Sequence, residues 1–344
     1  MIRFGPAGIP LSCKGRTLKD GIEDVHNLSL TAMEIQMVRP SSYARPPEDE
    51  EIGMTIKDIT EDFIIEIIRD DMPISSPDVE IEESDDLLYM SSSVSNTFGS
   101  LYPIGDIAKR MDVRMSIHTP YYMDLGSDTP LADTCMNSLR HAALILNALG
   151  GDTVVTSLGL YNSGSKEETD ARIYENIATV MDWWQDEELT PRLGIEISGH
   201  QETFGSLEQI LELCDTFDNI VPVVNFPRHH ARTEGSLMET QDFVDLIEIV
   251  QPYSKGGIYS QFSGVEHYGG EERKITPIKK GDLKFETLAD AITEVDPEMT
   301  VISCSPLLEH DAMYMRIIQE RVFSKKVAKM LKDQKKQAAE ATGE

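Results

Sequence analysis

The sequence predicts an α/β protein with the fold of a (β/α)8 barrel, and three observations lead to this prediction. Short apolar stretches typical of strands alternate with amphipathic stretches typical of helices along most of the chain. The predicted strands number about eight, which is the number that closes such a barrel. The chain has 344 residues, which is long enough for one domain of this size.

The predicted strands are short, apolar and separated by helical stretches. They cover residues 2–7, 32–38, 113–118, 153–158, 193–198, 220–226, 257–262 and 300–305. The first helix is expected to begin at Thr17, because Thr17 and Asp20 have the spacing of a capping box. A later helix has one apolar face, as expected of a helix that lies on a sheet, formed by Ile173, Ile177, Val180 and Trp184.

One segment interrupts this alternation. Between the second and third strands the chain is too long for a loop and one helix, and it is rich in acids, as in "RPPEDEEIG". We therefore predict an acidic insertion at 46–100, in the loop after strand 2, with some structure of its own around the apolar residues 62–72. The remainder of 1–325 is predicted to form a single barrel domain, followed by a lysine-rich, solvated helical tail at 326–344.

The bulk charge bears on possible partners. The formal net charge is −29, and a surface this negative repels polyanions, which makes DNA a doubtful partner. The sequence has neither a signal-peptide pattern nor the ~20 apolar residues of a membrane span, so we expect a cytoplasmic protein without a membrane partner. The cysteines form no CxxC pair, which argues against a zinc knuckle. The oligomeric state is left open.

Polar residues recur where the predicted strands end. These residues are His118, Ser157, Glu196, Asn225, Gln261 and Cys304, and Arg228 and His230 follow just after strand six. In parallel barrels the active site is built at the carboxyl ends of the strands. The polar ring is therefore the candidate site.

Five motifs in chain order resemble those of the endonuclease IV group, the type-2 apurinic endonucleases within the xylose isomerase-like barrels. They are "MSIHTPYYMDLGS", "LGIEISGHQETFGSLEQIL", "VNFPRHHARTEGSL", "FSGVEHYGGEERKITPIKKGDLKF" and "CSPLLEHDAMYM". The resemblance covers nearly the whole chain except the insertion and the tail. It implies a barrel fold, a cluster of up to three zinc ions held by His, Asp and Glu side chains, and cleavage of DNA at abasic sites in DNA repair.

Most of the zinc ligands that the resemblance implies are replaced in this chain. His118 and Glu196 match the group's ligands, and a one-residue shift would add His229. The other positions hold Ser157, Asn225, Arg228, Gln261, Arg273, Ile275 and Cys304. A guanidinium group cannot coordinate zinc and repels divalent cations. We therefore predict either no metal or a weakly bound divalent metal held by His118, Glu196 and His230.

The same replacements suggest a different ligand. Arg228, Arg232 and Arg273 place fixed positive charge at the site, and arginine suits phosphate or carboxylate. We predict a binding or regulatory protein for an anionic small molecule or sugar phosphate, with ligand-binding residues Tyr122, Asn225, Arg228, Arg232, Gln261 and Arg273. A structural alternative is that these arginines only pair with nearby acids such as Glu196 and Glu266.

Two enzymatic alternatives remain open from the sequence. The first is an active, metal-dependent apurinic endonuclease. The second is a sugar isomerase or epimerase in which Glu196 is the catalytic base. Whether the protein is an enzyme is not decided by its sequence.

Overall fold

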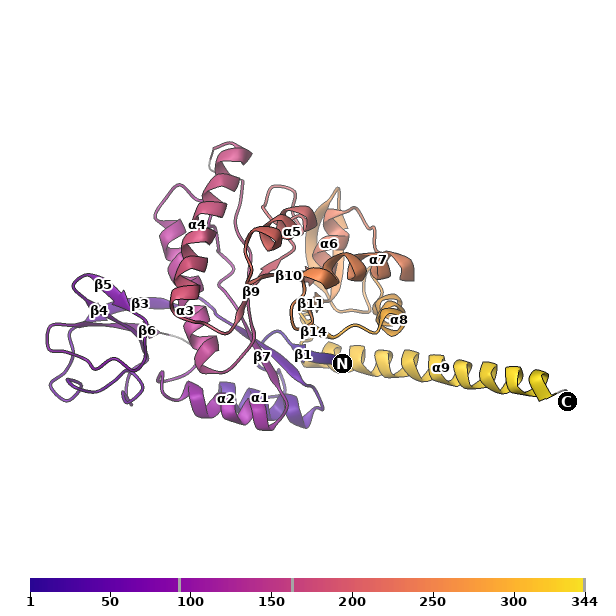
Figure 1. Ribbon diagram of the computed structural model, residues 1–344, viewed down its shortest axis with the longest axis horizontal. Coiled ribbons are helices and arrows are strands. Elements are labelled where there is room, and N and C mark those ends of the chain that lie inside the picture. The colour runs from indigo at the N-terminus through magenta and orange to yellow at the C-terminus, as the bar shows by residue number, and fades with distance from the viewer. Residues whose placement is uncertain (92–93, 162–163, 343–344) are drawn as a thin grey trace.

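Eight parallel strands form the barrel that the sequence predicts (Figure 1). The structure is a computed structural model that describes residues 1–91, 94–161 and 164–342. Neighbouring strands in the sheet follow the order β1-β14-β11-β10-β9-β8-β7-β2. Each strand lies within one residue of a predicted range. Their bounds are β1 (Ile2–Pro6), β2 (Ala32–Gln36), β7 (Arg114–His118), β8 (Thr153–Thr156), β9 (Arg192–Glu196), β10 (Ile220–Asn225), β11 (Ile258–Phe262) and β14 (Met299–Ser303).

The two edge strands of this sheet, β1 and β2, meet at the seam of the barrel. A parallel bridge joins Ala7 to Glu34 there. The strands approach so closely that a Cβ atom on Gly5 would lie 1.7 Å from the carbonyl oxygen of Ala32. Glycine at position 5 thus permits the close approach that brings the two edges together.

Helices cover the outside of the barrel, as the alternating pattern predicts. Their bounds are α1 (Leu18–Asn27), α2 (Leu101–Arg110), α3 (Leu131–Ala148), α4 (Lys166–Asp186), α5 (Leu207–Thr216), α6 (Phe226–Arg232), α7 (Thr240–Val250), a 3-10 turn (Gln251–Tyr253), α8 (Phe285–Val295) and α9 (Glu309–Thr342). Thr17 and Asp20 form the predicted capping box of α1. The predicted apolar face of α4 is buried, with each of its four residues at most 1% exposed.

Among the described residues, no helix has the length and apolar character needed to cross a membrane.

Two hydrophobic clusters fill the fold. A small cluster lies among the barrel strands and consists of Ala32, Val155, Val223, Tyr259 and Ile302. The larger cluster includes the apolar faces of the helices and extends into the insertion. The inside of the barrel is therefore packed with side chains, as is usual for this fold, and it leaves the strand ends as the place for polar chemistry.

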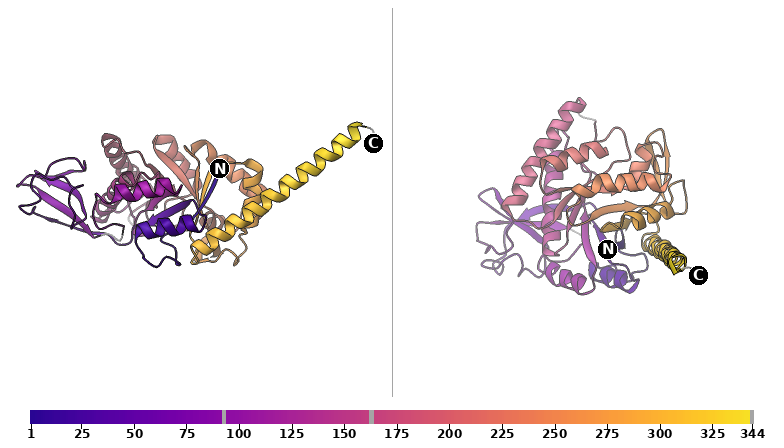
Figure 2. Two further views of the ribbon diagram at one scale, coloured as in Figure 1. Left: turned by 90° about the horizontal axis from the view of Figure 1, so that it is seen from below. Right: turned by 45° about the vertical axis from the view of Figure 1, so that its right-hand side comes forward.

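The insertion after strand 2 forms a small antiparallel sheet beside the barrel (Figures 1 and 2). Its strands, in the order β3-β6-β4-β5, are β3 (Ser41–Arg45), β4 (Ile64–Arg69), β5 (Met72–Ile74) and β6 (Asp86–Ser91). The sheet begins a few residues before the predicted insertion. The buried Glu66 on β4 ties it to α3, because its carboxylate lies 3.1 Å from His141 Nε2 and 3.2 Å from Arg140 Nη2.

Two further features differ from the elements that the sequence predicts. A hairpin of β12 (Gly264–Tyr268) and β13 (Glu271–Thr276) follows β11. Helix α9 runs from Glu309 to Thr342 without a break at 325, the predicted end of the barrel domain. Figure 2 shows that its second half extends beyond the barrel as a rod.

Candidate functional site

The carboxyl ends of the barrel strands bring polar side chains together in a region that we call the mouth. It contains His118 from β7, Glu196 from β9, Asn225 from β10 and Gln261 from β11. Glu34 from β2 belongs to the same group, because it is hydrogen-bonded to Gln261. Four of the five residues are at most 3% exposed, and only His118 is half-buried. Buried polar groups of this kind require partners.

A continuous chain of hydrogen bonds satisfies these groups. Gln261 Nε2 donates to Glu34 Oε2 at 3.0 Å, and the Tyr259 hydroxyl donates to the same oxygen at 2.9 Å. Asn225 Nδ2 donates both to Gln261 Oε1 at 2.7 Å and to Glu196 Oε1 at 2.9 Å. The two carboxylates, Glu34 and Glu196, are thus linked across the mouth through two fixed amides.

Arg228, in the first turn of α6, completes the mouth. Asn225 Oδ1 caps this helix by accepting the backbone N–H of Arg228 at 3.0 Å. The guanidinium group donates to Glu196 Oε2, and its Nε atom lies 3.3 Å from Glu272 Oε2 on β13. The Arg228 side chain is 33% exposed, so it closes the mouth and also faces outward.

The charges of the mouth fix its protonation state. Burial alone would raise the pKa of Glu196, but the charge of Arg228 and the contact with His118 lower this pKa to about 2. Burial alone would lower the pKa of His118, but the hydrogen bond and charge of Glu196 raise it to about 9. Near neutral pH the mouth therefore contains a carboxylate at Glu196 between two cations, Arg228 and protonated His118.

With this geometry established, the chain can be compared with known proteins. The family described as xylose isomerase-like TIM barrel matches residues 103–312. The chain belongs to this family. A Methanocaldococcus jannaschii protein described as uncharacterized is 30% identical over 227 residues, which cover 62% of this chain and 82% of that protein.

Solved structures of other proteins share the overall fold. Endonuclease IV from Thermus thermophilus matches with a TM-score of 0.58 and 14% identity over 93% of this chain and 99% of that one. D-psicose 3-epimerase with D-tagatose, from Clostridium cellulolyticum, matches with a TM-score of 0.55 and 10% identity over 92% and 99% of the two chains. At such identities the likeness concerns the fold alone, so the activity has to be argued from the mouth itself.

The structure assembles part of the predicted site and disperses the rest. His118, Glu196, Asn225, Arg228 and Gln261 meet in the mouth. Arg232 instead donates to the carbonyl oxygens of His200 and Thr203 in the loop after β9. Arg273 is exposed on β13, and Tyr122 packs against the hydrophobic core and the ring of Tyr121.

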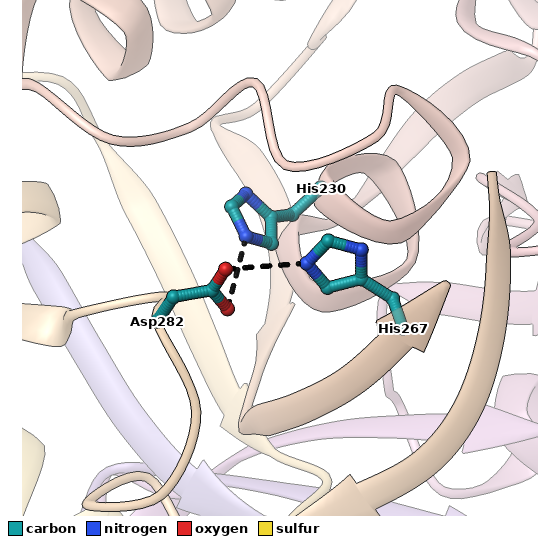
Figure 3. A group of neighbouring side chains, drawn as sticks. All are labelled: His230, His267 and Asp282. Atoms are coloured by element: carbon teal, nitrogen blue, oxygen red, sulfur yellow. Dashed lines mark hydrogen bonds and ion pairs between the residues drawn. The ribbon is translucent and has the colours of Figure 1, made fainter. Parts of the chain in front are cut away.

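The third predicted metal residue, His230, lies in a separate cluster. Its buried ring faces the ring of His267 with centroids 4.9 Å apart, and Figure 3 shows both rings directed at the carboxylate of Asp282. The Nε2 atoms of His230 and His267 lie 3.4 Å and 3.3 Å from the oxygens of Asp282. The three residues have the composition and spacing of a possible metal group. The described contacts of His230 include neither His118 nor Glu196.

The protonation of His230 argues against a metal in this cluster. Its Nδ1 accepts the backbone N–H of Leu237 at 3.1 Å. A neutral ring that accepts at Nδ1 carries its proton on Nε2, the atom that faces Asp282. A metal-ligating histidine has the opposite arrangement, in which the nitrogen away from the metal donates its N–H. The cluster is thus better described as an imidazole N–H directed at a carboxylate, which connects α6 to the segment before α8.

The mouth does not fit the zinc cluster that the resemblance to endonuclease IV implies. The Glu196 carboxylate is already paired with a guanidinium group that cannot itself coordinate zinc. The raised pKa of His118 keeps both of its ring nitrogens protonated near neutral pH, so neither has a free lone pair for a metal. Burial also raises the pKa of the Cys304 thiol to about 12, so this side chain is a neutral thiol. These three donors are thus protonated or paired with a cation.

Three mouth residues were not predicted from the sequence. Glu34 carried a usable signal, because it is a lone acid within the apolar stretch "AMEIQMV" and is 1% exposed. Tyr259 lies within a predicted strand, where an aromatic side chain is expected to belong to the hydrophobic core. Glu272 carried no signal, because its place at Arg228 depends on the hairpin β12–β13.

Proposed function

We propose that the mouth of this barrel binds a small anionic molecule, such as a sugar phosphate, without a metal, and that the protein acts through binding. The observation that supports this most is the position of Arg228. Its backbone is fixed by Asn225 and its guanidinium by Glu196, yet a third of the side chain is exposed. A guanidinium held in one orientation is a preorganised site for phosphate or carboxylate.

Protonated His118 supplies a second positive charge beside the same Glu196 oxygen that Arg228 contacts. The His118 Nε2 atom lies 3.6 Å from Glu196 Oε2, and its Nδ1 contacts the carbonyl oxygen of Thr119 at 2.7 Å. Arg228 and His118 are balanced by Glu196 and by the longer contact between Arg228 and Glu272. An incoming anion would take the place of Glu272 beside Arg228.

Glu272 marks the position that the anion would take. Its Oε2 atom is buried, lies 3.3 Å from Arg228 Nε and has no hydrogen-bond partner among the described residues. The contact is therefore weaker than the Arg228–Glu196 pair. A phosphate or carboxylate from a ligand could replace the Glu272 carboxylate beside the exposed edge of the guanidinium.

The mouth supports hydrolase and isomerase chemistry less well. A general base works best when its pKa lies near the working pH. The pKa of Glu196 is lowered to about 2, and its oxygens are occupied by Arg228 and Asn225. Neither the activation of water nor the removal of a sugar proton fits a carboxylate in this state.

The test is titration calorimetry of the metal-free full-length protein with ribose 5-phosphate and inorganic phosphate, with neutral ribose as the matched compound. We expect the phosphates to bind and ribose to bind at least about tenfold more weakly, the effect of losing one charge-assisted contact. Arg228→Gln should abolish the phosphate signal. Arg232→Gln, on the same helix but directed at the loop after β9, should retain it.

Two results would count against the proposal. In one, none of a panel of phosphorylated and carboxylated metabolites binds. In the other, binding survives in Arg228→Gln. Metal analysis of the purified protein accompanies the titration, because stoichiometric zinc that is lost in His118→Ala and Glu196→Ala would restore the metal-dependent alternatives.

A further inference from the structure

Helix α9 continues far beyond the barrel that it helps to cover. It has 34 residues and is therefore about 50 Å long. Ile318 is 3% exposed, but from Phe323 onward every side chain whose exposure is described lies in solvent. Figures 1 and 2 show this half as a rod away from the body. A helix of this kind gains little stability from its own sequence and usually depends on packing against a partner.

The protruding half has an apolar face with helical spacing. Phe323, Val327, Met330 and Leu331 are 57%, 38%, 54% and 53% exposed. Their separations of four, seven and eight residues place them on one side of the helix. We call these four residues the stripe. A contiguous apolar stripe bordered by charged residues is typical of an interaction surface.

The stripe borders a groove of about 700 Å³ at the foot of the barrel. The side chains of Met1, Ile2 and Ile292 line this groove, and most of the stripe forms its wall on the α9 side. Its acidic residues are Glu294, Asp296 and Glu320, and its basic residues are Arg316, which lies 2.6 Å from Glu320, and Lys326. The groove therefore combines an apolar floor with an acidic rim formed by Glu294 and Asp296.

The charge of the protruding half identifies the class of partner. Residues 321–336 contain seven lysines and arginines and one acid, in a chain whose net charge is −29. A nucleic acid or an anionic lipid surface would be attracted by this helix but repelled by the rest of the molecule. A groove that is both apolar and acidic lies beside the helix on the chain itself, and its character matches that of the apolar, cationic helix.

We propose that two copies of this chain associate through α9, with the stripe of each helix in the groove of the other. Such a contact is isologous, because helix and groove lie side by side on the same face of each chain. A two-fold axis then places each helix in the groove of the other chain at the same time. The apolar stripe provides the buried area, and the lysines meet the acidic rim. This inference does not depend on the ligand of the mouth.

The experiment measures the mass of the full-length protein by sedimentation velocity and light scattering. We expect twice the 38.5 kDa of one chain. Phe323→Glu together with Met330→Glu should give the mass of one chain, because four charges per dimer would be buried in the contact. Met72→Glu is the matched control, since Met72 is 67% exposed on the insertion and should leave the mass unchanged. Thermal unfolding by circular dichroism checks that both variants are folded.

Three outcomes would overturn the proposal. They are a wild-type protein with the mass of one chain, a Phe323→Glu/Met330→Glu variant that keeps the double mass, and a Met72→Glu control that loses it. A single-chain wild type that binds phosphatidylserine vesicles or duplex DNA would assign α9 to one of those surfaces instead.

Discussion

Arg228 and Glu196 form the central ion pair of the mouth, and removal of one partner leaves the other charge without compensation. Glu196→Gln would remove the main counter-charge of Arg228 in a largely buried site, and burial would then lower the pKa of His118, which Glu196 raises. We expect a loss of about 2–4 kcal/mol in the free energy of unfolding, measured in urea. The lower part of this range applies if solvent reaches the 33% exposed guanidinium.

The double variant Glu196→Gln/Arg228→Gln separates this ion-pair effect from simple loss of packing. We expect it to lose less stability than the two single variants together, with a coupling of about 1 kcal/mol or more. Strictly additive losses would mean that the two charges do not interact, contrary to the geometry described here.

Because of His118, we expect the stability of the protein to fall as the pH rises into the alkaline range. Its pKa is raised from 6.5 to about 9, so the folded state binds the proton more tightly than the unfolded state. The contribution of His118 to the free energy of unfolding is complete below about pH 6.5 and is lost as the pH rises through about 9. The loss is no more than about 3 kcal/mol. In unfolding experiments from pH 6 to pH 10, the midpoint of wild type should fall more steeply than that of His118→Gln.

An exposed histidine serves as the control for this pH dependence. His310 on α9 has a side chain that is 59% exposed, and His310→Gln should keep the alkaline slope of wild type. Parallel pH profiles for wild type and His118→Gln would contradict the assignment of that slope to His118.

Single residues also show how far the sequence determines the site. Strand-end position predicted His118, Glu196, Asn225 and Gln261, because parallel strands bring their carboxyl ends to one rim. Arg232 was predicted to supply positive charge at the site together with Arg228, yet Arg232 points to the loop after β9. Side-chain direction at the end of a short helix depends on tertiary contacts that periodicity does not encode.

At the scale of elements, one buried carboxylate holds the insertion sheet to the barrel. Glu66 on β4 is 3% exposed and accepts from Ser75 Oγ at 2.8 Å, besides its contacts with His141 and Arg140. Glu66→Ala leaves Ser75 of the insertion, and His141 and Arg140 on α3, without this partner. We expect a loss of about 2–4 kcal/mol in the free energy of unfolding and faster hydrogen exchange in the insertion strands β4 and β6.

The matched control for this variant is Glu83→Ala, since Glu83 is an exposed acid in the same insertion. It should change neither stability nor exchange. If Glu66→Ala destabilised the protein while exchange in β4 and β6 stayed at the wild-type rate, Glu66 would contribute to general stability and not to the attachment of the sheet.

Hydrophobic pattern predicted the barrel strands well and the added elements poorly. A barrel strand is buried on both faces and reads as a continuous apolar run, such as "IVPVVNF". The hairpin strands β12 and β13 are mostly polar and partly exposed, so they show no such run. The hairpin was missed for this reason, and with it the position of Glu272.

At the scale of the whole molecule, net charge opposes the DNA-cleaving activity that the resemblance to endonuclease IV implies. Duplex DNA carries dense negative charge, and a protein with a net charge of −29 needs a strongly basic face to bind it. The described basic groups of the mouth are compensated by Glu196 and Glu272. The cationic half of α9 borders the groove lined by Met1 and Ile2 at the amino end of β1, whereas the mouth lies at the carboxyl ends of the strands. We therefore expect no cleavage of an abasic duplex, with or without added zinc or manganese.

The decisive assay for this expectation follows an end-labelled abasic duplex on denaturing gels, with an endonuclease IV as the positive control. Low ionic strength is the informative condition, because any attraction between a basic face and the phosphates is then least screened. Cleavage by the wild type that disappears in Glu196→Gln would show that the carboxylate acts in hydrolysis despite its pairing with Arg228. The pairing would then have to open when DNA binds, so that the arginine would be released to a phosphate while Glu196 became free to act.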